Sequence, residues 1–138
     1  MNEGWQDDQY LIFFSDDEVQ LVSDRYGIAA TLPGFQILGL CGWDDFIVRD
    51  AHGSVFTVPT VPCVAQALAP FSLPARGVTL TSDERFLGKV KWYVKPIAFG
   101  GDPGPGENVT WVDHDQHAKL VRWWNDQYRS LTQGRGGA

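Results

Sequence analysis

The strongest constraint on the fold is a β-hairpin in the middle of the chain. Two runs rich in Val, Ile and Phe, residues 46–49 and 54–58, flank the segment Asp50-Ala51-His52-Gly53. This linker holds a Gly, which adopts the left-handed backbone conformation of a tight turn at low cost. Apolar runs joined by so short a turn pair as antiparallel strands. The chain therefore contains an antiparallel sheet, and its other elements must pack against that sheet.

A helix is predicted before the hairpin. Ser15 is followed three residues later by Glu18, the pattern of a capping box. Asp16 and Asp17 complete an acidic first turn, which complements the positive end of the helix dipole. Gly27 is suited to end the helix because Gly accepts the left-handed conformation found there. We therefore predict a helix over residues 16–26.

A longer helix is predicted at the C-terminal end. Asp113 and Gln116 again have the spacing of a capping box, and apolar residues recur downstream at helical intervals. Trp123 lies about 100° from this apolar face, where it either covers the edge of the core or is exposed for binding. The predicted apolar face consists of His117, Leu120, Val121, Trp124, Tyr128 and Leu131.

Further segments predict a single α+β domain over residues 1–133, followed by a flexible tail over 134–138. Residues 90–95 alternate Lys with large apolar side chains, as a half-exposed strand does. Residues 10–14 suggest a buried strand or the approach to the first helix, residues 78–81 an edge strand, and residues 35–40 either a strand or a short buried helix. We expect a mostly antiparallel sheet of five or six strands packed by the N-terminal helix and the longer C-terminal helix.

Charge is distributed unevenly along the chain. Residues 1–60 carry ten Asp and Glu against two Arg, a net charge of −8, whereas the remainder has a net charge of +2. Nucleic-acid binding requires a concentrated basic face, so we do not expect a nucleic-acid partner. The acidic half suits a basic protein partner, or serves only to keep the domain in solution.

Composition also bears on the cellular compartment. No run of about 18 apolar residues is present, so we expect no membrane span. The first eight residues are acidic and lack the basic start of a signal peptide, which favours a cytoplasmic protein. Cys41 and Cys63 lie among apolar neighbours, and we expect them to be unpaired core residues in a reducing compartment.

Residues that could carry catalysis or hold a metal are sparse. His114 and His117 are close enough on one helix to share a metal, but zinc requires three or four protein ligands and the chain has one other His. The Gly-rich segment 100–106 lacks the Gly-Lys-Ser/Thr ending of a phosphate-binding loop. A Gly-x-Ser-x-Gly motif does not occur. We therefore expect no metal, no cofactor and no enzymatic activity.

The best candidates for contact with a partner are acidic and aromatic residues of the first half. Trp43 stands next to Asp44 and Asp45, a combination that resembles the hot spots of protein interfaces. Because adjacent strand residues point to opposite faces, the two Asp are not expected to act as facing carboxylates, and a solvated start of a strand is the alternative. The predicted protein-binding residues are Asp16, Asp17, Glu18, Trp43, Asp44 and Asp45.

Three segments carry a resemblance to a known family. The helix over 16–26 ends in Tyr26-Gly27 before Leu32-Pro33, the paired strands span 43–59, and residues 108–112 lead into the Trp-Trp-Asn helix. In these segments the chain resembles the SUKH superfamily, which includes bacterial immunity proteins that neutralise polymorphic toxins and secretion-system effectors. The resemblance implies a five- or six-stranded, largely antiparallel sheet packed by helices, and tight binding to a cognate toxin.

We therefore expect a cytoplasmic, monomeric immunity protein that neutralises a cognate toxin or effector by protein–protein interaction, as in bacterial competition. Two alternatives stay open. One is a small enzyme that uses the region of His114 and His117, and the other is a regulatory adaptor protein.

Overall fold

In the computed structural model, an antiparallel six-stranded sheet runs in chain order from β1 to β6. The structure describes residues 1–74, 79–102, 104 and 106–136. The strands of this sheet are β1 (Asn2–Gln6), β2 (Gln9–Phe13), β3 (Gln36–Cys41), β4 (Asp45–Arg49), β5 (Val55–Pro59) and β6 (Ala69–Pro70). Strands β4 and β5 are the predicted hairpin, which is confirmed.

A second, two-stranded sheet and three helices complete the fold. Strands β7 (Val90–Tyr93) and β8 (Val109–Val112) pair with each other, antiparallel, and apart from the six-stranded sheet. The predicted α+β class is confirmed, although the sequence did not indicate that the sheet divides in two. The helices are α1 (Asp16–Tyr26), α2 (Ile28–Thr31) and α3 (His114–Gly136), with 3-10 turns η1 (Ala65–Ala67) and η2 (Ile97–Phe99).

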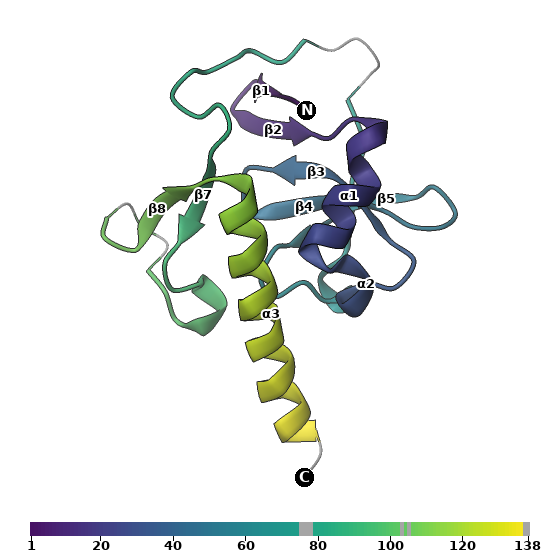
Figure 1. Ribbon diagram of the computed structural model, residues 1–138, viewed down its shortest axis with the longest axis vertical. Helices are drawn as coiled ribbons and strands as arrows, with labels where there is room; N and C mark the ends of the chain where they lie inside the picture. Colours follow the sequence, from purple (N-terminus) through teal and green to yellow (C-terminus); the bar gives the residue numbers. More distant parts are fainter. Residues whose placement is uncertain (75–78, 103, 105, 137–138) are drawn as a thin grey trace.

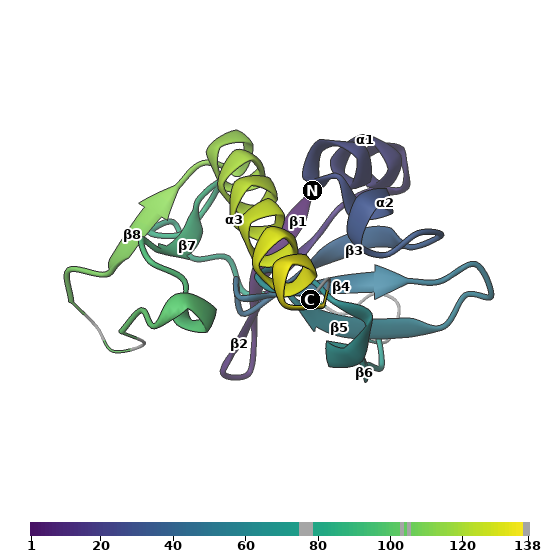
Figure 2. The same cartoon turned by 90° about the horizontal axis from the view of Figure 1, so that it is seen from below.

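The three helices cover one face of the six-stranded sheet (Figures 1 and 2), and α3 lies between α1 and the β7–β8 pair. The main core fills the space between these layers. Tyr10 and Ile12 of β2 belong to it, whereas Leu11, between them, joins a smaller cluster with Leu80. This alternation is the period of two expected for a strand that is buried on both faces.

Helix α1 has the predicted bounds because both of its caps form. The Ser15 amide donates a hydrogen bond to the Glu18 carboxylate at 2.8 Å, as in a capping box. At the other end Gly27 has φ 66°, and its amide reaches the carbonyls of the last turn. The three acidic residues of the first turn lie where the helix dipole favours negative charge.

Residues 35–40, which the sequence left between strand and helix, contain most of strand β3. The buried Ser23 of α1 joins this strand to the helix layer, because its hydroxyl accepts the Ile37 amide at 2.8 Å. A bulge between Ile37 and Gly39 shifts the register with β4. Residues 75–78 lie outside the described residues, and of the predicted edge strand 78–81 the structure shows a single bridge from Thr81 to Trp5.

Helix α3 begins as predicted, and its buried face overlaps the predicted one but is rotated from it. The Asp113 carboxylate accepts the Gln116 amide at 2.7 Å and so caps the first turn. Among the side chains of this helix that the structure describes, the buried ones are His117, Ala118, Val121 and Asn125. Leu131, assigned to the apolar face, is exposed, and Leu120, Trp124 and Tyr128 are half-buried. The helix also continues to Gly136, so residues 134–136 of the predicted tail are helical, while 137–138 lie outside the described residues.

Candidate functional site

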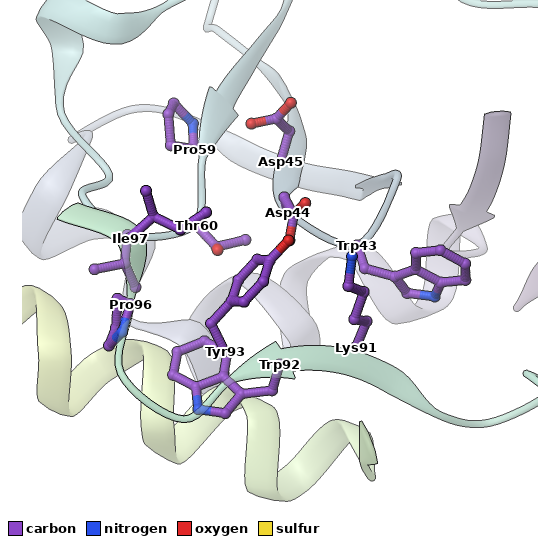
Figure 3. Close-up of a pocket in the computed structure, with 11 residues that line it drawn as sticks. Trp43, Asp44, Asp45, Pro59, Thr60, Lys91, Trp92, Tyr93, Pro96 and Ile97 are labelled. Atoms are coloured by element: carbon purple, nitrogen blue, oxygen red, sulfur yellow. The ribbon is translucent and has the colours of Figure 1, made fainter. Parts of the chain in front are cut away.

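A pocket of about 180 Å³ opens between the two sheets (Figure 3). We call it the acid-lined pocket. One wall comes from the turn between β3 and β4 and from the end of β5, and the other comes from β7 and the start of η2. The lining residues are Trp43, Asp44, Asp45, Pro59, Thr60, Val61, Lys91, Trp92, Tyr93, Pro96 and Ile97.

The turn between β3 and β4 brings two adjacent acids to this pocket. Gly42 and Trp43 both have positive φ, 61° and 63°, which is rare for a residue with a bulky side chain. Asp44 therefore belongs to a turn and not to the strand, and its carbonyl accepts the Thr60 amide at 2.9 Å. Asp45 is the first residue of β4. We expected the two side chains to point to opposite faces because adjacent residues of a strand do so. Only Asp45 lies in the strand, so this expectation does not hold for the pair, and both acids line the same pocket.

The two carboxyl groups differ in direction and exposure. In Figure 3 the ring of Tyr93 is directed toward Asp44, whereas the Asp45 carboxyl lies toward Pro59. Asp44 keeps solvent contact at the mouth of the pocket, and Asp45 is half-buried. The alternative that these acids are solvated residues at the start of a strand therefore holds in part for Asp44, which is exposed to solvent. It does not hold for Asp45.

The pocket walls shift the pKa of both carboxyls. Partial desolvation raises the pKa of Asp44; Lys91 lowers it in part, and the negative charge of Asp45 raises it further. Desolvation also raises the pKa of Asp45. Among the described residues neither carboxylate has an ion-pair partner within 4.0 Å. Keeping both carboxyls ionised in the pocket therefore costs free energy. A positively charged ligand bound beside them would reduce that cost.

The opposite wall carries a cation on an aromatic ring. Lys91 and Tyr93 are two residues apart on β7, and the Lys91 ammonium lies 5.0 Å from the centroid of the Tyr93 ring. Trp92, between them, is buried and contacts His117 of α3 edge to face. The wall is thus an aromatic surface that carries one cationic side chain.

Asn125 of α3 fixes the segment that follows β5. Its side-chain amide donates to the Thr60 carbonyl at 2.8 Å, and its oxygen accepts the Cys63 amide at 2.9 Å. All three residues are buried, so these hydrogen bonds satisfy polar groups that water cannot reach. Cys41 and Cys63 are both free and buried, which confirms their predicted place in the core.

Trp43 is a member of an intramolecular aromatic cluster and is not free to insert into a partner. Its ring stacks on Tyr10 at 4.7 Å between centroids and meets Phe86 and Trp111 edge to face at 5.4 and 5.2 Å. Figure 3 shows the indole turned away from the pocket. Sequence reasoning missed this cluster, because its members come from four separate segments and no local pattern joins them. Trp43 therefore holds the acid-bearing turn in place.

The other predicted binding residues lie elsewhere. Asp16 and Asp17 are exposed at the start of α1, and α3 separates α1 from the β7 wall in both views (Figures 1 and 2). The Glu18 carboxylate forms an ion pair with the Met1 amine at 2.7 Å and accepts a hydrogen bond from the Ser15 amide. These contacts lower the pKa of Glu18 to about 2. The six predicted residues thus fall into two groups. Only Trp43, Asp44 and Asp45 line the acid-lined pocket, whereas Glu18 lines a different pocket, together with Met1 and His114.

The two histidines of α3 are packed inside the protein. His117 is fully buried, and its Nδ1 shares a hydrogen bond of 2.5 Å with the Tyr26 hydroxyl. Burial, with a smaller effect of His114, lowers the pKa of His117 to about 3. His114 is half-buried against Phe14. In the described part of the chain no group of three or more His, Cys, Asp or Glu is arranged to hold a metal ion.

An exposed apolar ridge continues from the pocket toward α3. Ile97, at the pocket edge, is 49% exposed, and Phe99 follows it in η2. The Phe99 ring lies 4.8 Å from that of Trp124, which in turn contacts Trp123 at 4.9 Å. Trp123 is 55% exposed, so of its two predicted positions the structure shows the exposed one. We call these four residues the aromatic ridge.

Comparisons with family models, with curated proteins and with solved structures find no match to this chain. Among the described residues, no helix combines the length and apolar character that crossing a membrane requires. The function must therefore be inferred from the pocket and the surface around it.

Proposed function

We propose that this chain is a bacterial immunity protein that binds a basic toxin or effector through the acid-lined pocket and the aromatic ridge, and so neutralises it. The observation that carries the proposal is the pocket itself, in which two acids that form no ion pair with any described residue lie opposite an aromatic wall and next to the aromatic ridge. Interface hot spots combine such features, with apolar anchors at the centre and charged groups that select the partner. The resemblance to the SUKH superfamily suggests the class of partner.

Electrostatics favours a basic partner. The pocket acids belong to the half of the chain with a net charge of −8, and such a field accelerates encounter with a positive surface. Toxins that act on nucleic acids carry basic clefts, since they must bind phosphate. We propose that the protein covers such a cleft in the cytoplasm, where its two unpaired cysteines would remain reduced.

The enzyme alternative relied on His114 and His117. His117 is fully buried and hydrogen-bonded to Tyr26, so a substrate cannot reach it without a change in the core. A general base must come within hydrogen-bond reach of the proton that it removes. Inhibition by binding needs no catalytic group. It requires only a surface that the partner can contact, such as the acid-lined pocket and the aromatic ridge.

We expect Asp44→Lys/Asp45→Lys to weaken binding of the proposed cognate toxin by at least about 30-fold at low salt. Truncating a buried interfacial charge costs about 2–5 kcal/mol, and reversal adds repulsion. The melting temperature should hardly change, because neither carboxylate has an ion-pair partner within the described residues. Calorimetric titrations across a salt series measure both the affinity and its salt dependence.

The matched control is Asp16→Lys/Asp17→Lys, which changes the charge equally on the far side of α3. It should reduce affinity modestly and only at low salt, through the long-range field. Its effect on the helix dipole, about 1 kcal/mol per charge at most, is monitored by thermal unfolding. Equal affinity for all three proteins at every salt concentration would show that the acids only keep the domain in solution.

A further inference from the structure

We propose that the acid-lined pocket is a recognition site for one arginine side chain of the partner. This inference rests on the proposed function, because the arginine belongs to the protein that is bound. It goes beyond it by naming the group that enters the pocket and the residues that receive it.

The size of the pocket selects a single side chain. Its volume of about 180 Å³ lies below the range of about 300–1,000 Å³ that is typical of small-molecule sites. This space suits the end of one long side chain and is too small for a folded segment or a nucleotide. The mixed lining of acids and aromatic rings suits a group that is both charged and flat.

The positions of the acceptors favour a guanidinium over an ammonium group. Asp44 and Asp45 line the same pocket but point in different directions, and the Thr60 and Tyr93 hydroxyls offer further acceptors in its wall. Arginine has five N–H donors spread in a plane, so it can reach acceptors on several sides at once. A lysine ammonium is compact and strongly hydrated, and it would lose more solvation for fewer directed contacts.

Lys91 occupies the place that the incoming cation would take. Its ammonium lies over the Tyr93 ring at 5.0 Å, and its charge is the one that lowers the pKa of Asp44. It has no ion-pair partner within 4.0 Å in the described part of the chain, so no ion pair has to break for the ammonium to leave the Tyr93 ring. A guanidinium that stacks on Tyr93 would displace Lys91 toward solvent. Lys91 therefore acts as an internal competitor that lowers the affinity for arginine.

The test uses the tripeptide amide acetyl-Gly-Arg-Gly and its lysine and citrulline analogues. Nuclear magnetic resonance follows the Trp92 indole and the amides of Asp44 and Asp45 during titration to roughly 50 mM, which covers millimolar Kd values. We expect saturable shifts with the arginine peptide, binding at least about threefold weaker for lysine, and no binding of citrulline, which keeps the shape without the charge. Lys91→Met should tighten arginine binding at least about twofold, and Asp44→Asn/Asp45→Asn should abolish it.

The outcomes separate this inference from the proposed function. Absence of saturable shifts in both the wild type and Lys91→Met would overturn the arginine pocket, as would equal binding of arginine and citrulline. If the toxin still bound through Asp44 and Asp45 in that case, the proposed function would stand without the arginine pocket. Arginine binding together with failure to bind or neutralise the toxin would instead overturn the proposed function and leave the pocket as a site for a different arginine-bearing partner.

Discussion

Gly39→Ala should lower the free energy of unfolding by on the order of 4 kcal/mol or prevent folding altogether. A Cβ at this position would lie 2.0 Å from the Ile12 carbonyl oxygen and 3.2 Å from the Phe13 Cα. Both are backbone atoms of the paired strand β2, which cannot move aside without breaking the centre of the sheet. The close approach, and not a break in the strand, explains the Gly in this segment.

Chemical denaturation of Gly39→Ala beside Gly34→Ala tests this reading. Gly34 has φ 85° with no atom within 4 Å of an added Cβ, so alanine there meets only conformational strain of about 1–2 kcal/mol. We expect the Gly39 variant to lose at least twice as much stability. Similar losses in the two variants would mean that the sheet accommodates the methyl group and that β2 and β3 are less closely packed than described.

Acid should unfold the protein through His117. Its pKa is 6.5 in an unfolded chain and about 3 in the folded protein, where burial excludes the charged form. Between these values the unfolded chain binds a proton that the folded protein does not. The stability contributed by the neutral imidazole is therefore complete above about pH 6.5 and is lost at about 1.4 kcal/mol per pH unit as the pH falls toward 3. His114, whose pKa burial also lowers, acts in the same direction.

Urea denaturation at several pH values between 7 and 4 measures this slope, and His117→Gln should flatten it because glutamine does not titrate. His52→Gln, in the exposed hairpin turn, is the matched variant that replaces a histidine outside the core. If His117→Gln does not fold, the imidazole resonances of the wild type provide the same information, since His117 should stay neutral down to about pH 4. A slope that His117→Gln leaves intact, or protonation near pH 6.5, would contradict the buried neutral imidazole.

Local signals in the sequence predicted the elements that local interactions stabilise. The capping box at Ser15 and the stop at Gly27 gave the bounds of α1, and the turn at residues 50–53 gave the hairpin. These features depend on hydrogen bonds and backbone preferences within a few residues. The start of α3 followed from Asp113 for the same reason.

Tertiary contacts decided what the sequence did not reveal. The predicted face of α3 included His117 and Val121, which are buried, but it was wrong by part of a turn because packing also places Asn125 inward, beside the segment after β5. Pattern alone does not indicate that a polar residue has buried partners. The division of the strands into two sheets likewise depends on packing between distant segments.

Sequence reasoning identified one wall of the candidate site and missed the other. The acids at positions 44 and 45 and their aromatic neighbour stood out from composition, but their arrangement depends on two consecutive residues with positive φ, one of them Trp43. A Trp is disfavoured in that conformation, so no sequence rule places it there, and the aromatic cluster that stabilises it comes from four segments. The wall contributed by β7 could not be paired with these acids before the fold was known.

Growth protection tests the central claim most directly. The proposed cognate toxin is expressed from an inducible promoter in cells that also express the wild type, Asp44→Lys/Asp45→Lys or Asp16→Lys/Asp17→Lys, each at equal soluble level. The account predicts that the wild type and the α1 variant restore growth, whereas the pocket variant does not. Failure of the wild type to protect, or equal protection by all three proteins, would contradict neutralisation through the acid-lined pocket.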